Sequence, residues 1–192
     1  MKTKFANACI IIFVTMFAIS CKENTEKDKV VAQEENKNFI VEIDYKTSQK
    51  NMFIMYFYEE KGQFFDAENT VWLGVQPSEV VQKAVLEIPD ERLPIDLRIN
   101  FCFEKLKGPI QFEAITLKYQ DLSFEITKAQ ITEYFEPNEY LKFDAATGLA
   151  TPIELDGKTD PFFVSKDKLW NLIKNLNEGT LNQPATILAP TN

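Results

Sequence analysis

The sequence predicts a mainly β protein, in which antiparallel strands form a β-sandwich and one α-helix follows near the C-terminus. Many short apolar or alternating segments recur at intervals of roughly 8–12 residues and are separated by turn residues, a spacing typical of sandwiches and barrels. The helical periodicity is confined to the end of the domain, so an alternating α/β fold is not expected. No internal repeat is visible, which argues against a propeller or a solenoid.

The first half of the domain supplies the clearest strand patterns. Apolar and charged side chains alternate in residues 38–46, which indicates a strand with one buried face. Residues 52–58 are apolar on both faces, as in a central strand that is covered on both sides. The strands expected in this half are 38–46, 52–58, 71–75, 80–88 and 95–103, with a polar loop at 62–70 and a turn at 89–94.

The second half is less regular. Its expected strands are a hairpin of residues 110–119 and 122–126, which turns at Gln120–Asp121, and short strands near 140–144 and 150–155. The apolar parity of the hairpin changes between Ala114 and Ile115, which indicates a β-bulge.

One helix is predicted after the strands. Its apolar stripe, with spacing i, i+3, i+4, i+7, consists of Leu169, Leu172, Ile173 and Leu176. Ser165 can cap the N-terminus of this helix, and Gly179 is expected to end it. We expect the stripe to dock on the sandwich, with Trp170 as an additional anchor; the alternative is a partner-binding helix.

Residues 1–20 are expected to be a signal peptide that ends at a lipid-attachment site. Two lysines precede the uncharged run from Phe5 to Ser20, which is shorter than the about 20 residues that a spanning helix needs. Ser20-Cys21 resembles the lipobox of bacterial lipoproteins, although Ala18 stands where leucine is commonest. The resemblance implies that Cys21 carries acyl chains such as palmitate and anchors the protein in a membrane. Ordinary secretion with a free Cys21 and an uncleaved membrane anchor are the alternatives.

The predicted organisation is a tether of residues 21–37, a domain of residues 38–178 and a disordered tail of residues 179–192. The tether offers few residues that could enter a core, so it is expected to be disordered. No Asp follows Cys21, so the known signal for retention in the inner membrane is absent, and the run CKENTEKD resembles surface-export signals of Bacteroidota lipoproteins. We therefore expect an exported lipoprotein of the outer membrane, on its periplasmic or its surface face.

Charge and residue usage argue against several functions. Without residues 1–20 the chain has 19 basic and 29 acidic residues, a net charge of −10, which argues against nucleic acid as a partner. The chain contains no histidine, which excludes Ser-His-Asp and Cys-His catalysis and His-ligated zinc. Cys102 is expected to be a small buried side chain. We expect no cofactor and no enzymatic activity.

The segment of residues 95–119 resembles a known kind of domain. An L-R-I-x-F strand, a Gly-containing turn and an I-x-F-x-x-I-x-L strand are similar to the latter half of jelly-roll carbohydrate-binding modules and to sandwich domains of bacterial polysaccharide machinery. The resemblance implies a jelly-roll-like sandwich that binds glycans on one face or at its loop tips.

Aromatic side chains in expected loops are the candidate ligand-binding residues, because aromatic rings stack on sugar rings while polar neighbours bond the hydroxyls. They are Phe64, Phe65, Trp72, Tyr134, Phe135, Tyr140, Phe162 and Phe163. The alternative is that these side chains close the ends of the sandwich core.

Acidic residues of the last loops are candidates for hydrolysis or for calcium binding. They are Asp144, Glu154, Asp156 and Asp160, whose spacing matches no calcium-loop pattern. Three functions are therefore compatible with the sequence. The first is non-catalytic glycan binding in the cell envelope, the second is the assembly of another envelope protein, and the third is a small carboxylate-dependent glycoside hydrolase.

Overall fold

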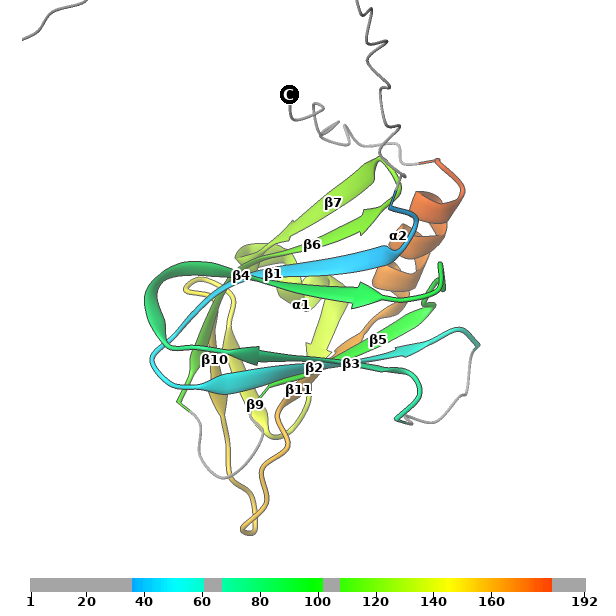
Figure 1. Cartoon of the computed structure of the whole chain (residues 1–192). Coiled ribbons are helices and arrows are strands. Elements are labelled where there is room, and N and C mark those ends of the chain that lie inside the picture. The colour runs from blue at the N-terminus through cyan, green and yellow to red at the C-terminus, as the bar shows by residue number, and fades with distance from the viewer. Residues whose placement is uncertain (1–35, 61–66, 102–107, 181–192) are drawn as a thin grey trace, which may run out of the picture. The chain divides into compact units, whose positions relative to one another are not determined.

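Two antiparallel sheets pack face to face around an apolar core in the computed structural model (Figure 1). The structure describes residues 36–60, 67–101 and 108–180. The first sheet has the order β4 (Ser78–Ile88), β1 (Phe39–Thr47), β6 (Ile110–Tyr119), β10 (Leu149–Pro152) and β9 (Leu141–Asp144), and β7 (Leu122–Thr127) also pairs with β6. The second sheet has the order β3 (Thr70–Val75), β2 (Asn51–Tyr58), β5 (Asp96–Phe101), β11 (Phe162–Ser165) and β8 (Phe135–Pro137). The predicted mainly β sandwich is confirmed.

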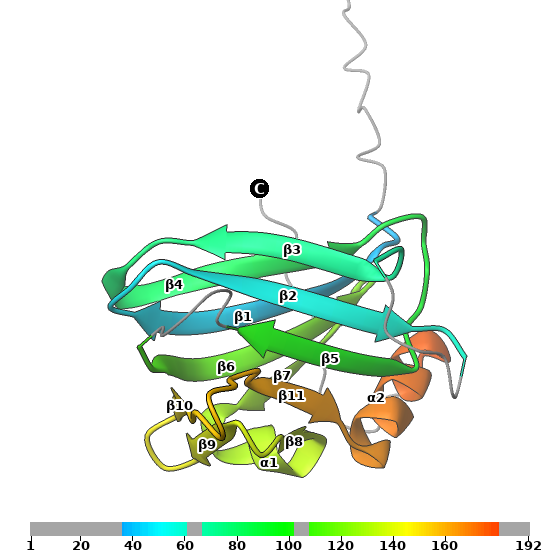
Figure 2. The same ribbon diagram turned by 90° about the horizontal axis from the view of Figure 1, so that it is seen from below.

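The strongest sequence patterns correspond to the central strands. The predicted buried face of β1, which consists of Phe39, Val41, Ile43 and Tyr45, is buried. Leu97, Ile99 and Phe101 of β5 are also fully buried, as their alternation predicts. Figure 2 looks onto the second sheet, where β3, β2, β5 and β11 lie side by side.

The predicted bulge is present in β6, at Glu113. Asp44 of β1 pairs with Ala114 and the next residue, Tyr45, pairs with Phe112, so Glu113 is the extra residue. An extra residue reverses the facing of the side chains that follow it, which explains the change of apolar parity. The bulge lies just before the predicted position.

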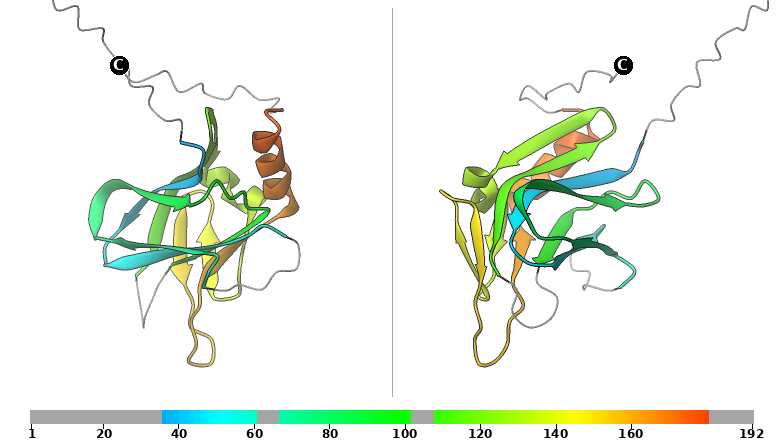
Figure 3. Two further views of the ribbon diagram at one scale, coloured as in Figure 1. Left: turned by 45° about the vertical axis from the view of Figure 1, so that its right-hand side comes forward. Right: turned by 60° about the vertical axis from the view of Figure 1, so that its left-hand side comes forward.

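Helix α2 (Asp167–Asn177) closes one end of the sandwich (Figure 3). The predicted apolar stripe is buried in the core, and Gly179 follows the helix with a φ of 64°, so docking and helix end are confirmed. The predicted cap is wrong, because Lys166 occupies the N-cap position. Ser165 belongs to β11, where its hydroxyl accepts a hydrogen bond from the Leu97 amide at 2.9 Å.

Several short elements were not predicted. A 3₁₀ helix η1 (Lys128–Gln130) runs into the one-turn helix α1 (Ile131–Tyr134), so the prediction of a single helix is wrong. Strands β8 and β11 also replace expected loops. These segments are too short to show a period, and their conformation is set by the strands and helices against which they pack.

Several predictions concern residues outside the described part of the chain. These are the signal peptide, Cys21, most of the tether, Cys102 and all but the first residues of the tail. Within the described ranges, no helix has the length and apolar character required to cross a membrane.

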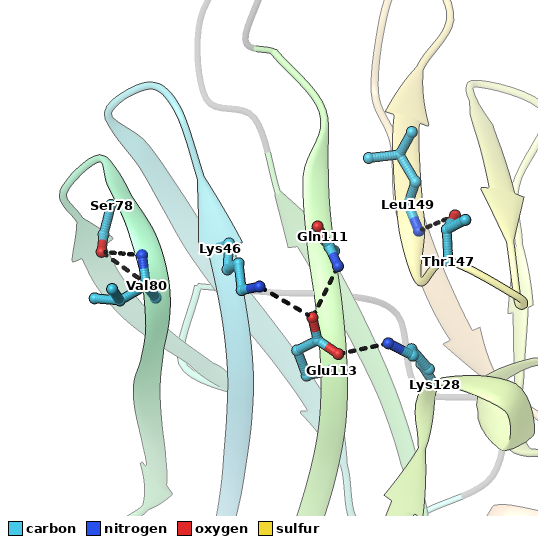
Figure 4. Close-up of polar contacts among 8 residues, drawn as sticks. All are labelled: Lys46, Ser78, Val80, Gln111, Glu113, Lys128, Thr147 and Leu149. Atoms are coloured by element: carbon cyan, nitrogen blue, oxygen red, sulfur yellow. Dashed lines mark hydrogen bonds and ion pairs between the residues drawn. The ribbon is translucent and has the colours of Figure 1, made fainter.

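The bulge residue Glu113 binds three neighbours on the outer face of the first sheet (Figure 4). Its carboxylate accepts hydrogen bonds from Lys128 Nζ at 2.7 Å and from Gln111 Nε2 at 2.8 Å, and it lies 3.6 Å from Lys46 Nζ. The hydrogen bond from Lys128 is the main cause that lowers the pKa of Glu113, although burial opposes it. The bulge thus links β1, β6 and η1 through one carboxylate.

We expect Glu113→Gln to lower stability only while the carboxylate of the wild type is ionised. Because the folded pKa is lowered, the ion pairs stabilise the fold above the ordinary glutamate pKa of about 4.3, and this contribution is lost as the pH falls through the lowered folded value. At pH 7 the loss should be about 1 kcal/mol or less, since solvent screens partly exposed pairs. Urea unfolding at pH 7 and pH 3 measures it, with Glu125→Gln on the exposed face of β7 as the control. An equal loss at both pH values would contradict this role.

Candidate functional site

The outer face of the second sheet gathers aromatic and polar side chains from four strands. Phe53, Met55 and Phe57 of β2 point into the core, so the alternate residues Ile54 and Tyr56 lie on the opposite face. By the same alternation, Arg98 and Asn100 of β5 lie on that face. This surface is turned toward the viewer in Figure 2, and no described helix crosses it.

Strand pairing sets these side chains in two rows. In the first row Ile54 pairs with Trp72 on one side and with Asn100 on the other, and Asn100 pairs with Phe162. In the second row Tyr56 pairs with Arg98. Directly paired residues have neighbouring side chains on the same face, so residues that are far apart in sequence form one surface.

Arg98 lies at the centre of this surface and is held by its neighbours. Its guanidinium carbon lies 3.6 Å from the centre of the Phe162 ring and 5.5 Å from that of Tyr56, within the range of cation–π contact. Its Nη2 donates a hydrogen bond to Asp160 Oδ2 at 2.8 Å, and its Nε donates to Asn100 Oδ1 at 2.7 Å. Asn100 Nδ2 completes the triangle by donating to Asp160 Oδ1 at 2.9 Å.

The segment that carries Asp160 is fixed to the sheet by Asn138. The Asn138 side chain donates to the Asp160 carbonyl oxygen at 2.7 Å and accepts a hydrogen bond from the Phe162 amide at 3.1 Å. Asp160 and Phe162 are thus placed together before any ligand arrives. A site whose side chains are already ordered loses less conformational entropy when it binds.

The surface combines an exposed ring with charged and amide groups whose charges balance. Trp72 is 52% exposed, an unusual state for so large an apolar residue. The Arg98 cation is paired with the Asp160 carboxylate, so the face offers hydrogen-bonding groups with little local net charge. Chemically it can stack on an apolar ring face and bond the polar substituents around it.

The structure places the predicted aromatic residues in different environments. Trp72 and Phe162 lie on this face, whereas Phe64 and Phe65 lie outside the described residues. Tyr140 is half-buried in the turn before β9.

The placement of Tyr134, Phe135 and Phe163 in exposed loops is wrong. Phe135 and Phe163 are strand residues with no exposed surface, and Tyr134 in α1 is 7% exposed. The reason is that β8 and β11 extend the second sheet and direct Phe135 and Phe163 into the core. Tyr134 is buried at the end of α1, where its ring centre lies 5.8 Å from that of Phe124. In the fold described here these three side chains cannot form a surface site.

Sequence reasoning missed Tyr56, Arg98 and Asn100. The alternation of residues 95–103 contained the signal for two of them, because it placed Arg98 and Asn100 opposite the apolar face. The sequence does not contain the order of the strands, which places β3 beside β2 and β11 beside β5.

The four candidate acids are not gathered into one site. Asp144 binds its own turn, through the Thr147 hydroxyl at 2.9 Å and the Ala146 amide at 2.9 Å, and the Thr147 contact is the main cause that lowers its pKa. Asp160 belongs to the Arg98 triangle, whereas Glu154 and Asp156 are exposed. Over the ranges 36–60, 67–101 and 108–180, no three His, Cys, Asp or Glu residues lie close enough to hold a metal ion.

Two hollows elsewhere on the described surface are small. One of about 120 Å³ lies beside Lys46, Gln111 and Leu149 on the first sheet. Another, of about 150 Å³, lies between Leu93 and Trp170 at the side of α2. Pockets for drug-sized ligands measure about 300–1,000 Å³, so neither competes with the outer face of the second sheet as the main candidate.

Comparison with protein-family models, with curated proteins and with solved structures finds no match for this chain.

Proposed function

We propose that the protein is a non-catalytic glycan-binding module that a lipid on Cys21 anchors in the cell envelope. The observation that carries the glycan-binding part is the surface on which Trp72, Tyr56 and Phe162 surround the Arg98–Asn100–Asp160 triangle. The anchoring part rests on the sequence pattern that ends at Cys21.

The chemistry of the face fits a carbohydrate. A pyranose ring has an apolar face, which packs on an aromatic ring, and a rim of hydroxyls, which both donate and accept hydrogen bonds. Trp72 supplies the ring, Arg98 supplies donors and Asp160 supplies acceptors. Asn100 is buried, and its side-chain amide holds Arg98 and Asp160 in place. Because the cation and the carboxylate neutralise each other, a neutral sugar fits this face better than a uronic acid.

The experiment is a glycan-array screen with the full-length protein in detergent, followed by titration of the hits. The chain has two tryptophans, so Trp170→Phe leaves Trp72 as the sole tryptophan reporter. A saturable change in its fluorescence is expected on binding. Trp72→Ala and Phe162→Ala should each weaken binding by about tenfold, which corresponds to a stacking contribution of about 1–1.5 kcal/mol.

The matched control is Leu149→Ala, which removes an exposed apolar side chain from β10 of the first sheet, outside the second sheet that forms the surface, and should leave the affinity unchanged. Silence across plant, algal and bacterial glycans would contradict the proposal. Binding that is equally strong in Trp72→Ala and Phe162→Ala would show that glycans bind elsewhere.

A further inference from the structure

Strand β4 forms one edge of the first sheet and exposes apolar side chains. Among the described strands of this sheet β4 pairs with β1 alone. Val80, Val81 and Val85 are 72%, 49% and 46% exposed. Three exposed valines on one edge strand are unusual, because proteins usually protect such edges against pairing with other chains.

The regular part of β4 is short and bounded. The register between β1 and β4 shifts where Tyr45 pairs with Gln82 and Thr47 pairs with Ser78, so the ladder is irregular over residues 79–81. Pro89 directly follows the strand and cannot donate a backbone hydrogen bond. Only residues 82–88 offer a regular edge, which favours one closed contact over open-ended aggregation.

The order of the charged residues on this edge indicates which partner it binds. We propose that β4 pairs with β4 of a second copy, antiparallel, about a twofold axis that passes through Val85. In this register Val85 lies opposite Val85 of the second copy, and Lys83 lies opposite Glu87 of the second copy, twice by symmetry. Opposite charges that face each other across two strands stabilise the pair.

Neighbouring registers are disfavoured. A twofold axis perpendicular to the sheet pairs outward-facing residues with outward-facing residues, so the register can move only in steps of two residues, and each step moves the axis by one residue. An axis through Ala84 places Lys83 opposite Val85, and an axis through Leu86 places Glu87 opposite Val85, so both lose the pairing of Lys83 with Glu87. An axis through Lys83 places two lysines opposite each other and Glu79 opposite Glu87, and an axis through Glu87 places two glutamates opposite each other. An axis through Val81 falls in the irregular part of the strand.

The two charged residues are already ordered on the outer face. Lys83 Nζ binds Glu42 at 2.8 Å and Asp44 at 3.0 Å, and the lysine side chain remains 46% exposed. Glu87 accepts hydrogen bonds from the side-chain amides of Asn38 at 2.7 Å and Asn36 at 3.2 Å.

The self-complementary order of Lys83, Val85 and Glu87 is the reason to choose a second copy rather than an unrelated envelope protein. Lys83, Val85 and Glu87 are not part of the proposed glycan-binding surface. An experiment can therefore contradict one proposal without contradicting the other.

The test uses two variants, each of which should lose self-association by itself, whereas a mixture of the two should associate. Two full-length chains with different affinity tags are mixed in excess detergent, and co-purification is measured. Val85→Lys and Val85→Glu should each lower self-association by about tenfold or more, because like charges meet at the axis. A mixture of the Val85→Lys chain with the Val85→Glu chain should restore it.

The same pair of substitutions at Leu155 is the control and should leave co-purification unchanged, since Leu155 is exposed in a turn outside β4. Retained circular dichroism of each Val85 variant confirms that it is folded. Wild-type chains that do not co-purify at any accessible concentration would overturn the proposal, and so would a Lys–Glu mixture that associates no better than either variant alone.

Discussion

Phe163→Ala is expected to lower the free energy of unfolding by about 3–5 kcal/mol, whereas Phe162→Ala should cost about 1 kcal/mol. Phe163 is fully buried, with its ring centre 5.7 Å from that of Phe101, 5.6 Å from that of Phe112 and 5.2 Å from that of Phe143. Its removal leaves a cavity at the meeting point of both sheets. Phe162, its neighbour in sequence, lies on the other face of β11 under Arg98.

Urea unfolding of the two variants measures this difference, and glycan titration should give the opposite order. Phe162→Ala should weaken binding and stay stable, whereas Phe163→Ala, under conditions where it is folded, should bind as the wild type does. Equal losses of stability would show that the two rings share the core. If Phe163→Ala does not fold, Phe163→Leu retains much of the apolar volume and tests the same position.

Gly148→Ala is expected to destabilise the protein by about 3 kcal/mol or more, because backbone strain and a steric clash add. Gly148 has a φ of 76° in the turn between β9 and β10, and a Cβ there would overlap the Phe112 carbonyl oxygen. The backbones of the two residues are joined by a hydrogen bond of 2.8 Å from the Phe112 amide to the Gly148 carbonyl oxygen. An added methyl group would therefore push β10 away from β6.

Gly157→Ala is the matched control for this substitution. Gly157 has a similar φ of 74°, but a Cβ there would meet no atom within 4 Å. It should cost about 1 kcal/mol, which is the strain of a left-handed alanine alone. Thermal unfolding of both variants separates strain from clash, and equal effects would show that close approach to β6 contributes nothing.

The candidate site shows where sequence reasoning stops. The alternation in residues 95–103 places Arg98 and Asn100 on one face of a strand, and the aromatic ring of Trp72 makes it a candidate for sugar stacking. That Trp72 and Phe162 belong to the same surface follows only from the order β3-β2-β5-β11, which joins segments about 90 residues apart. No local pattern contains that order.

The short helices and strands are not predicted from the sequence for a related reason. Residues 131–137 and 162–165 are too brief to complete a period of either helix or strand, so their sequence predicts loops. β11 exists because its backbone fits between β5 and β8, and its inward ring, Phe163, meets aromatic residues from both sheets. Tertiary pairing therefore outweighs local propensity in these segments.

The sequence by itself determined the fold class, the buried faces of β1 and β5, the bulge in β6 and the helix that closes the sandwich. These features follow from strand alternation and helical spacing, which are local patterns that can be recognised by the regular recurrence of apolar residues in the sequence. Only the tertiary structure decided which phenylalanines are core and which strands are neighbours. It also brought Arg98 and Asp160 together, because contacts between distant segments depend on sheet order and packing rather than on any local period.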